Sequence, residues 1–554
     1  MPRVTADPLV VDTATGAVRG ALAEGIRRWR GIPYAAVPVG PLRFVAPQPP
    51  EPWDGIRDAL AFGDAAPQHV NKAVTLPDGV EQSEDCLTLN VLAPAEPAAA
   101  PGEPLQDAAA GHPVLVWIHG GAYFAGSSAQ PLFDGTHLVQ NGDVVVVSVN
   151  YRLGALGFLD FSEWADATAP DTRFDTNLGL RDILAALRWV RENIAAFGGD
   201  PGNVTLFGES AGGGCVTTLL TSPAAAGLFH RAIAESSPAT SVYGRERARA
   251  VARRFLGLVG IDPDAVDGPA DGSPATRPTG ASSDAAASAN PIAQLRRLPA
   301  DRLSQAAFDL IGAVAADSPG TLAIAPVVDG DIVPEHPIDA YRAGTQLPIP
   351  LIIGTNRDEA SLFRLMKSPL MPITESSVHA MFAEIKAERP DLDDAETRIE
   401  TAYPHFPQHR TPAELSRDAG FRMPSIWLAA AHSRVAPTRM YRFDHSPPLL
   451  KLLGIGATHG AEIAYVFGNL KIAKKDFSFD LGGLPAARAL SALMQHRWLA
   501  YARTGEPAGA DGSPWPLYDT ATRSTLIFDH GETVADDPDA AIRTAWGDEV
   551  IGFS

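Results

Sequence analysis

The run Gly208-Glu209-Ser210-Ala211-Gly212 places one serine between two glycines, directly after the apolar segment Val204–Phe207. The segment has the composition of a buried strand, and residues 213–220 are small and then apolar, as at the start of a packed helix. A serine on a sharp strand-to-helix turn is held in a strained conformation, so its neighbours must be small. The helix also directs free N–H groups and the positive end of its dipole at the serine. The pattern therefore predicts a nucleophile at Ser210.

A second glycine-rich loop could donate the hydrogen bonds that such a serine needs. Acyl transfer generates a tetrahedral oxyanion that requires preorganised donors. The apolar run Val114–Ile118 leads directly into His119-Gly120-Gly121-Ala122-Tyr123, although a Gly-Gly pair by itself is also compatible with a plain turn. Together with Ser210, this loop is typical of the α/β-hydrolase fold, in which the residue after the serine, here Ala211, is a further donor.

In this fold the three residues of the catalytic triad occur along the chain in the order serine, acid, histidine. Glu359 lies shortly after the apolar strand Leu351–Gly354, at the carboxyl end where sites of α/β sheets are built. Asp358 is adjacent to Glu359, and spacing alone does not choose between these two acids.

Four histidines after the serine are candidates for the base. His459 stands in a loop of small residues, and His445 is its competitor by local chemistry. His405 and His409 lie in a polar stretch flanked by prolines, which is typical of a surface. The residues alone therefore leave His445 and His459 open.

The elements that must position these residues are predicted by apolar patterning. Apolar runs without alternation are typical of strands covered on both faces, and strands are expected at 16–20, 114–118, 144–149, 204–207, 351–354, 440–443 and 525–528. Apolar residues at helical spacing from Leu180 to Ile194 predict a helix. The alternation of strand and helix predicts an α/β fold, with a large, mostly parallel central sheet flanked by helices. We expect one domain, 1–554, in which the polar segment 262–290 is a flexible low-complexity insertion.

Composition limits the possible partners and the compartment. The 554 residues carry a formal net charge of −20, and so acidic a surface repels nucleic acid and anionic lipid, so neither is expected as a partner. Residues 1–13 lack the pattern of a signal peptide, and no apolar run approaches transmembrane length. The two cysteines, Cys86 and Cys215, are expected to be free thiols. These features predict a cytoplasmic monomer, and the arginine- and alanine-rich composition indicates a bacterium. No metal or cofactor motif occurs, so no cofactor is expected.

Further motifs along nearly the whole chain resemble the type-B carboxylesterases, which include the cholinesterases and bacterial p-nitrobenzyl esterases. They lie at 31–35, 38–44, 83–91, 150–154, 177–182, 197–203, 208–212, 357–359 and 458–460. The resemblance chooses Glu359 over Asp358 and His459 over His445, and so implies a triad of Ser210, Glu359 and His459.

The resemblance also assigns residues around this triad. It implies oxyanion donors at Gly121, Ala122 and Ala211, and a supporting network from Glu209 and Ser236. Arg43 and Glu84 match a structural ion pair of the family. Animal members pair the cysteine matching Cys86 with an earlier one, and this chain has none before Cys86, so that disulfide cannot form.

The function implied is that of a serine carboxylesterase, which hydrolyses esters of hydrophobic or aromatic small molecules without a cofactor. Residues near the motifs are expected to form an apolar pocket that favours such groups: Tyr123, Phe124, Leu362, Phe363, Met366 and Phe421. No tryptophan occurs between Pro67 and Cys86, which argues against choline esters as preferred substrates. A carbamate or amide hydrolase, a lipase and a catalytically silent binding module on this fold are the alternatives.

Overall fold

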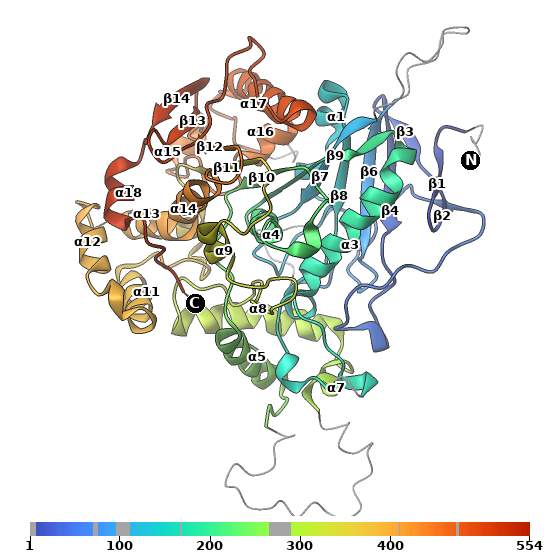
Figure 1. Ribbon diagram of the computed structural model, residues 1–554, viewed down its shortest axis with the longest axis horizontal. Helices are drawn as coiled ribbons and strands as arrows, with labels where there is room; N and C mark the ends of the chain where they lie inside the picture. The colour runs from blue at the N-terminus through green and yellow to red at the C-terminus, as the bar shows by residue number, and fades with distance from the viewer. Residues whose placement is uncertain are drawn as a thin grey trace, which may run out of the picture.

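The structure is a computed structural model that describes residues 7–69, 76–95, 111–166, 169–264, 290–408, 410–471 and 476–553. Within these residues a central sheet of 11 strands runs through the molecule, with helices on both of its faces (Figure 1). Its strands, in spatial order, are β14 (Glu532–Asp536), β13 (Ser524–Phe528), β12 (Thr438–Phe443), β11 (Leu351–Asn356), β10 (Arg231–Glu235), β9 (Gly199–Glu209), β7 (His112–Ile118), β8 (Val145–Val149), β6 (Thr88–Pro94), β4 (Ile26–Pro33) and β3 (Ala21–Ala23).

Strand direction divides the sheet into a parallel centre and antiparallel edges. The strands from β13 across to β8 are all parallel to their neighbours. At one edge β14 is antiparallel, and at the other edge β6, β4 and β3 are. The predicted α/β class with a mostly parallel sheet is therefore confirmed.

One predicted strand belongs to a different sheet. The segment 16–20 forms β2 (Gly16–Arg19), which pairs with β1 (Val10–Thr13) and β5 (Ile56–Asp58) in a separate sheet of three strands. The other predicted strands all lie in the central sheet, and the helix expected from Leu180 is α3 (Leu178–Asn193). Short-range patterning thus located these seven strands but not the sheet to which each belongs, and it did not predict β3, β4, β6, β10 and β14 of the central sheet.

Alternate residues of the central strands enter two different hydrophobic cores. In β7, Val114, Val116 and Ile118 belong to the larger core, whereas Leu115 and Trp117 belong to the smaller one. Successive side chains of a strand point to opposite faces, so each core is one face of the sheet. This burial on both faces is why the central strands are continuous apolar runs.

The helices divide between the same two cores. The smaller core is covered by α1 (Thr136–Gly142), α16 (Ile463–Phe467) and α17 (Leu484–Thr504), which Figure 1 shows together beside one face of the sheet. The larger core receives side chains from α2 (Gly154–Gly157), α3, α4 (Ala211–Leu219), α5 (Arg245–Val259), α7 (Pro291–Leu295), α8 (Ala300–Asp317), α9 (Pro337–Ala343), α11 (Glu375–Glu388), α12 (Ala395–Thr401), α13 (Thr411–Arg417), α14 (Met423–His432) and α18 (Ala540–Trp546). Two short helices, α10 (Ser361–Met366) and α15 (Pro448–Leu452), bury no residue fully.

The structure also bears on the expected ion pair, the two cysteines, the polar insertion and the search for membrane-spanning segments. Arg43 and Glu84 form the expected ion pair through two hydrogen bonds, and Arg43 also donates to three backbone carbonyls before α8. Cys86 and Cys215 are buried and free, as predicted. Residues 265–289, nearly all of the expected insertion, lie outside the described residues. Among the residues described, no helix is long and apolar enough to span a bilayer.

Candidate active site

Ser210 occupies the sharp turn that the Gly-x-Ser-x-Gly pattern predicts. Strand β9 ends at Glu209 and helix α4 begins at Ala211, which leaves Ser210 alone between them with φ 55° and ψ −123°. A side chain at Gly208 or Gly212 would collide with the Ile118 carbonyl at the end of β7. Both glycines are therefore required because the turn packs directly against the neighbouring strand. The strained backbone holds the serine hydroxyl clear of the sheet.

A histidine and a glutamate complete a hydrogen-bonded line with this serine. His459 Nε2 lies 2.8 Å from Ser210 Oγ, and His459 Nδ1 lies 2.7 Å from Glu359 Oε2. Glu359 is fully buried, and its other oxygen accepts hydrogen bonds of 2.7 Å from the Asn356 N–H and from the Ser236 hydroxyl. Glu359 is thus fixed on one side by donors and presents only Oε2 to the imidazole.

The alternatives that the residues left open lie elsewhere. Asp358 accepts a hydrogen bond from the Ala457 N–H and pairs with Arg357, and within the described residues it makes no hydrogen bond or ion pair with His459. His445 lies near Asp529, beyond the ends of β12 and β13. His405 is exposed, as expected, and His409 lies outside the described residues. The residues that the family resemblance selected are therefore the ones that the structure brings together.

The loop after β7 has the backbone that an oxyanion site needs. Gly121 has φ 120°, and a side chain there would collide with the Ala125 carbonyl, whereas Ala122 and Tyr123 have left-handed φ values of 50° and 63°. The N–H groups of Gly121 and Ala122 donate no hydrogen bond to the protein within the described residues. Ala211 is the first residue of α4, where an N–H has no partner within its helix. These N–H groups are available to a developing negative charge.

A second carboxylate contacts the histidine. Glu209 Oε1 lies 3.2 Å from His459 Nε2 and has no hydrogen-bond partner within the described residues. Burial raises the pKa of Glu209, and the charge of Glu359 adds to this, while His459 opposes it. For His459, burial acts to lower the pKa, but the charges of Glu209 and Glu359 outweigh burial and raise it. Glu209 is therefore positioned to stabilise the imidazolium form.

Replacing Glu209 should alter the pH dependence of the reaction. Above its own pKa of about 7, Glu209 carries a negative charge beside His459, and Glu209→Gln removes that charge, so the pKa of His459 should fall. Because a general base must be neutral, the acidic limb of kcat/KM should move to lower pH, by roughly one unit. The measurement is a pH profile of kcat/KM on an uncharged ester.

The matched control for that change is Glu235→Gln. Burial raises the pKa of Glu235 to about 8, although a hydrogen bond from Trp498 opposes the shift. Glu235 is therefore mostly neutral at pH 7, and glutamine resembles that form. The pH profile of kcat/KM for Glu235→Gln should therefore stay near that of the wild type. If the acidic limb does not move in Glu209→Gln, Glu209 does not raise the pKa of His459.

Further buried polar groups near the site were missed by the sequence analysis. Glu462 accepts a hydrogen bond from Asn356 Nδ2 and has an oxygen 3.4 Å from Ser236 Oγ, and burial raises its pKa strongly. The sequence offers one indication of Glu462: it lies three residues after His459, and a turn of the chain can bring a residue at that spacing back towards the histidine. Ser236, with φ 47°, thus lies between Glu359 and Glu462, and this places both predicted supporting residues, Glu209 and Ser236, beside the triad.

A cavity of about 880 Å³, including its opening to solvent, lies over Ser210. None of the described residues that line it is charged, and most are apolar or aromatic. Three predicted pocket residues are in its lining: Tyr123, Phe363 and Phe421. The Phe421 ring also lies 4.5 Å from the His459 ring, centroid to centroid.

The other three predicted pocket residues are not among the residues that line this cavity. Phe124 packs against the larger core and near Phe308. Leu362 is only partly buried on α10, and Met366, at the end of that helix, is 48% exposed. Nearness in sequence to a motif therefore did not fix the direction of these side chains.

Much of the actual lining comes from segments that carry no motif. They come from the loop after Ser236, the middle and last turns of α11, and the last described residues of the chain: Pro238, Tyr243, Met381, Ile385, Trp546, Ile551, Gly552 and Phe553. No local pattern marks these residues as neighbours of Ser210. Only the long-range packing of the larger core brings them to the site.

A mostly parallel sheet with a serine on the turn after one strand, and a histidine and a glutamate after later strands, defines a serine hydrolase of the α/β-hydrolase fold. Comparison with known proteins gives the family. The model of the carboxylesterase family matches residues 7–544, and the chain belongs to that family. It is a carboxylic ester hydrolase.

Individual relatives cover almost the whole chain. The chain is 36% identical to the para-nitrobenzyl esterase of Bacillus subtilis (strain 168), over 96% of this chain and 97% of that protein. It is 32% identical to the cocaine esterase of Oryctolagus cuniculus, over 92% and 90%. Among solved structures, a PNB esterase superposes with a TM-score of 0.77 at 35% identity, covering 98% of this chain and all of the other. A carboxylesterase of Geobacillus stearothermophilus has a TM-score of 0.76 at 36% identity, covering 97% of this chain and all of that one.

Proposed function

We propose that the protein hydrolyses carboxylic esters through an acyl-enzyme on Ser210. His459 Nε2 accepts the hydroxyl proton as Ser210 Oγ attacks the ester carbonyl, and the imidazolium then gives that proton to the leaving alcohol. Water enters next, loses a proton to His459 and attacks the acyl carbon. The imidazolium then returns that proton to Ser210 Oγ as the bond to the serine breaks and the free acid leaves. The observation that carries this proposal is the continuous line from Ser210 Oγ through His459 to the buried Glu359, with links of 2.8 and 2.7 Å.

The surrounding groups have proposed roles in the same cycle. Glu359 orients the imidazole and stabilises its charged form. The N–H groups of Gly121, Ala122 and Ala211 hold the oxyanion of each tetrahedral intermediate. This proposal is supported by two observations: these N–H groups donate no backbone hydrogen bond within the part of the chain that the structure describes, and Ala122 and Ala211 line the cavity beside Ser210.

The preferred substrates are proposed to be esters whose acyl or alcohol part is uncharged and hydrophobic or aromatic. A lining without charged side chains cannot compensate the desolvation of a charged group, but favours apolar and aromatic surface. Two relatives that are named for aromatic esters, a para-nitrobenzyl esterase and a cocaine esterase, support this choice.

Initial rates on p-nitrophenyl esters from acetate to palmitate, with a matched carbamate and an anilide, test the substrate class. We expect turnover that peaks at short or aromatic acyl groups and is far slower on the anilide. A chain whose best substrate is palmitate would instead be a lipase, and one that prefers the carbamate would refute an ester specificity. Labelling of Ser210 by a fluorophosphonate distinguishes a narrowly specific hydrolase from a silent binding module if no ester is turned over.

The size of the acyl group accepted should depend on the end of the chain. Phe553 lines the cavity, so Phe553→Ala should enlarge it and raise kcat/KM for longer or bulkier acyl groups relative to acetate, by several-fold. The control is Phe477→Ala, because Phe477 is 52% exposed and does not line the cavity. If Phe553→Ala leaves the ratio of kcat/KM for bulky acyl groups to kcat/KM for acetate unchanged, Phe553 does not limit the size of the acyl group.

The setting in which the enzyme acts is part of the proposal. We propose a cytoplasmic bacterial monomer, supported by two buried thiols that remain unpaired and by a net charge of −20, which opposes self-association. Light scattering of the purified chain checks the monomer, and fractionation of the source cells checks the compartment.

A further inference from the structure

A second group of titratable side chains lies at the same edge of the sheet as Ser210 but apart from it. His445 follows β12 by two residues, and Asp529 and His530 follow β13 directly. In the sheet these strands are three and four positions from β9, or roughly 14–19 Å at ordinary strand spacing. His445 was a candidate base in the sequence, and the proposed mechanism does not use it.

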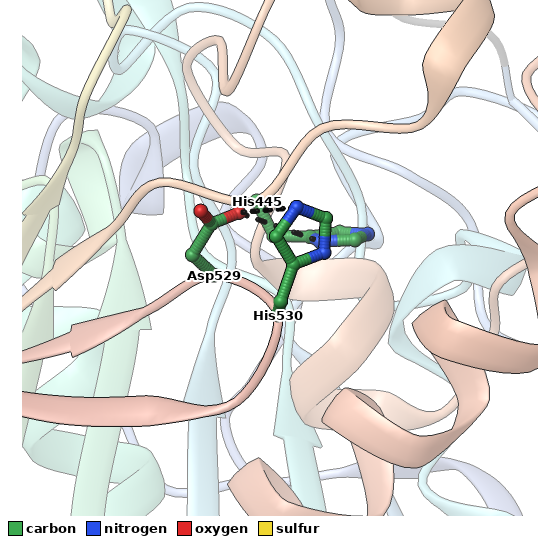
Figure 2. A group of neighbouring side chains, drawn as sticks. All are labelled: His445, Asp529 and His530. Carbon is green, nitrogen blue, oxygen red and sulfur yellow. Dashed lines mark ion pairs between the residues drawn. The ribbon is translucent and has the colours of Figure 1, made fainter.

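The three side chains converge on one point. Asp529 Oδ1 lies 3.8 Å from His445 Nδ1 and 3.9 Å from His530 Nε2, and one ligand atom from each residue lies within 4.8 Å of the others. Figure 2 shows both imidazoles turned towards the same carboxylate oxygen, with His530 in the turn that follows β13. All of these distances are too long for hydrogen bonds, so the groups face one another without bonding.

His445 is the unusual member of this group. Its side chain is only 4% exposed, yet neither ring nitrogen makes a hydrogen bond within the described residues. The rings of Phe443 and Tyr465 lie against it. A buried imidazole is costly unless something satisfies its nitrogens.

Another cluster of similar composition lacks this feature. His379 lies near Glu396 and Glu400, and its Nδ1 makes a 2.7 Å hydrogen bond with Glu396. That hydrogen bond raises the pKa of His379, and the side chain is 45% exposed. His379 is thus explained as a surface ion pair, whereas His445 is not explained by its protein neighbours.

We propose that His445, Asp529 and His530 bind a divalent transition-metal ion, with Zn²⁺ as the best match. Two imidazoles and one carboxylate are ligands that Zn²⁺ prefers, and three protein ligands leave the fourth tetrahedral position to water. Tetrahedral ligands at about 2.0–2.1 Å from zinc lie roughly 3.3–3.5 Å apart. The separations of 3.8 and 3.9 Å between Asp529 Oδ1 and the two imidazole nitrogens exceed this by about half an ångström, which the exposed His530 and the turn that carries it can close.

A metal here would tie together two elements that are far apart in the chain. It would join the end of β12 to the turn between β13 and β14, and satisfy the buried His445. The ion would stabilise the folded chain by mass action, because the unfolded chain does not hold the three ligands together. The site is separate from Ser210, so the bound ion is expected to act on stability and to take no part in ester hydrolysis.

Isothermal titration calorimetry of Zn²⁺ into the chelator-treated full chain, freed of any polyhistidine tag, tests the proposal. One ion per chain should bind, with a micromolar or tighter dissociation constant. His530→Ala and Asp529→Asn should weaken binding at least tenfold. His530 is 81% exposed, so its removal should not affect folding. His379→Ala, the matched control, should bind as the wild type does.

Two further readouts make the result decisive. Co²⁺ bound at a four-coordinate site should give intense visible absorption in the wild type and lose it in His530→Ala. Zn²⁺ should raise the thermal midpoint of the wild type but not that of His530→Ala. If binding is absent at millimolar Zn²⁺, or has the same affinity in His530→Ala and Asp529→Asn as in the wild type, the proposal is wrong. Weakening in His379→Ala alone would place the ion at the other cluster and would also overturn it.

Discussion

Ser210→Ala should lower kcat by about 10⁶-fold. The substitution removes the hydroxyl that is proposed to attack the carbonyl while leaving the proposed oxyanion donors and the cavity in place, so binding of the ester should change little. The residual rate should still exceed the uncatalysed rate, because the N–H groups of Gly121, Ala122 and Ala211 remain. Stopped assays on a p-nitrophenyl ester, combined with loss of fluorophosphonate labelling, measure the effect.

Ser222→Ala is the matched control for this change. Ser222 lies three residues past the end of α4, is fully buried, and its hydroxyl has no hydrogen-bond partner within the described residues. It therefore tests the loss of a buried serine hydroxyl without touching the proposed chemistry, and should retain nearly all activity. Full activity in Ser210→Ala would remove the nucleophile assignment and, with it, the proposed mechanism.

The parts of the site that the sequence predicted best are those encoded locally. The turn at Ser210 and the loop at Gly121 each depend on glycines within a few residues, because close backbone approach and left-handed φ exclude side chains there. The choice of acid and base is not local. Ser210 and His459 are separated by 249 positions, and His459 and Glu359 by 100, so only the family resemblance could pair them.

The substrate cavity shows where local inference ends. Leu362 and Met366 are close in sequence to Glu359, yet neither lines the cavity, whereas Phe553, at the far end of the chain, does. Apolar patterning predicts that a residue is buried but not against which partner it packs. The same limit applies to the strand at 16–20, which was predicted as a strand but joins a separate small sheet.

Buried carboxylates escaped the sequence analysis for a related reason. Glu235 ends the apolar strand β10, where a charged residue is normally read as the point at which the chain reaches solvent. The structure instead buries it completely, with a hydrogen bond from Trp498 Nε1 on a helix 263 positions away. Burial of a single acid therefore depends on tertiary packing that no short pattern encodes.

Glu359→Gln should lower kcat by about 10⁴-fold without unfolding the protein. Glu359 Oε1 accepts hydrogen bonds from the Asn356 N–H and the Ser236 hydroxyl. In the variant the amide oxygen must take that position, which turns the amide NH₂ towards His459 Nδ1. Nδ1 then has to accept, so the proton of the neutral imidazole moves to Nε2, the atom that must accept the proton of Ser210.

The damage from Glu359→Gln would thus come mainly from a wrong tautomer, with a further loss because the amide cannot stabilise the imidazolium. Asp358→Asn is the matched control, since it makes the same acid-to-amide change one residue earlier, at a side chain that contacts Ala457 and Arg357 but not His459. It should cost only a few-fold in kcat. Both variants should keep the wild-type thermal midpoint within a few degrees. Equal losses in the two would show that the effect lies in the shape of the loop, and that Glu359 has no special relation to His459.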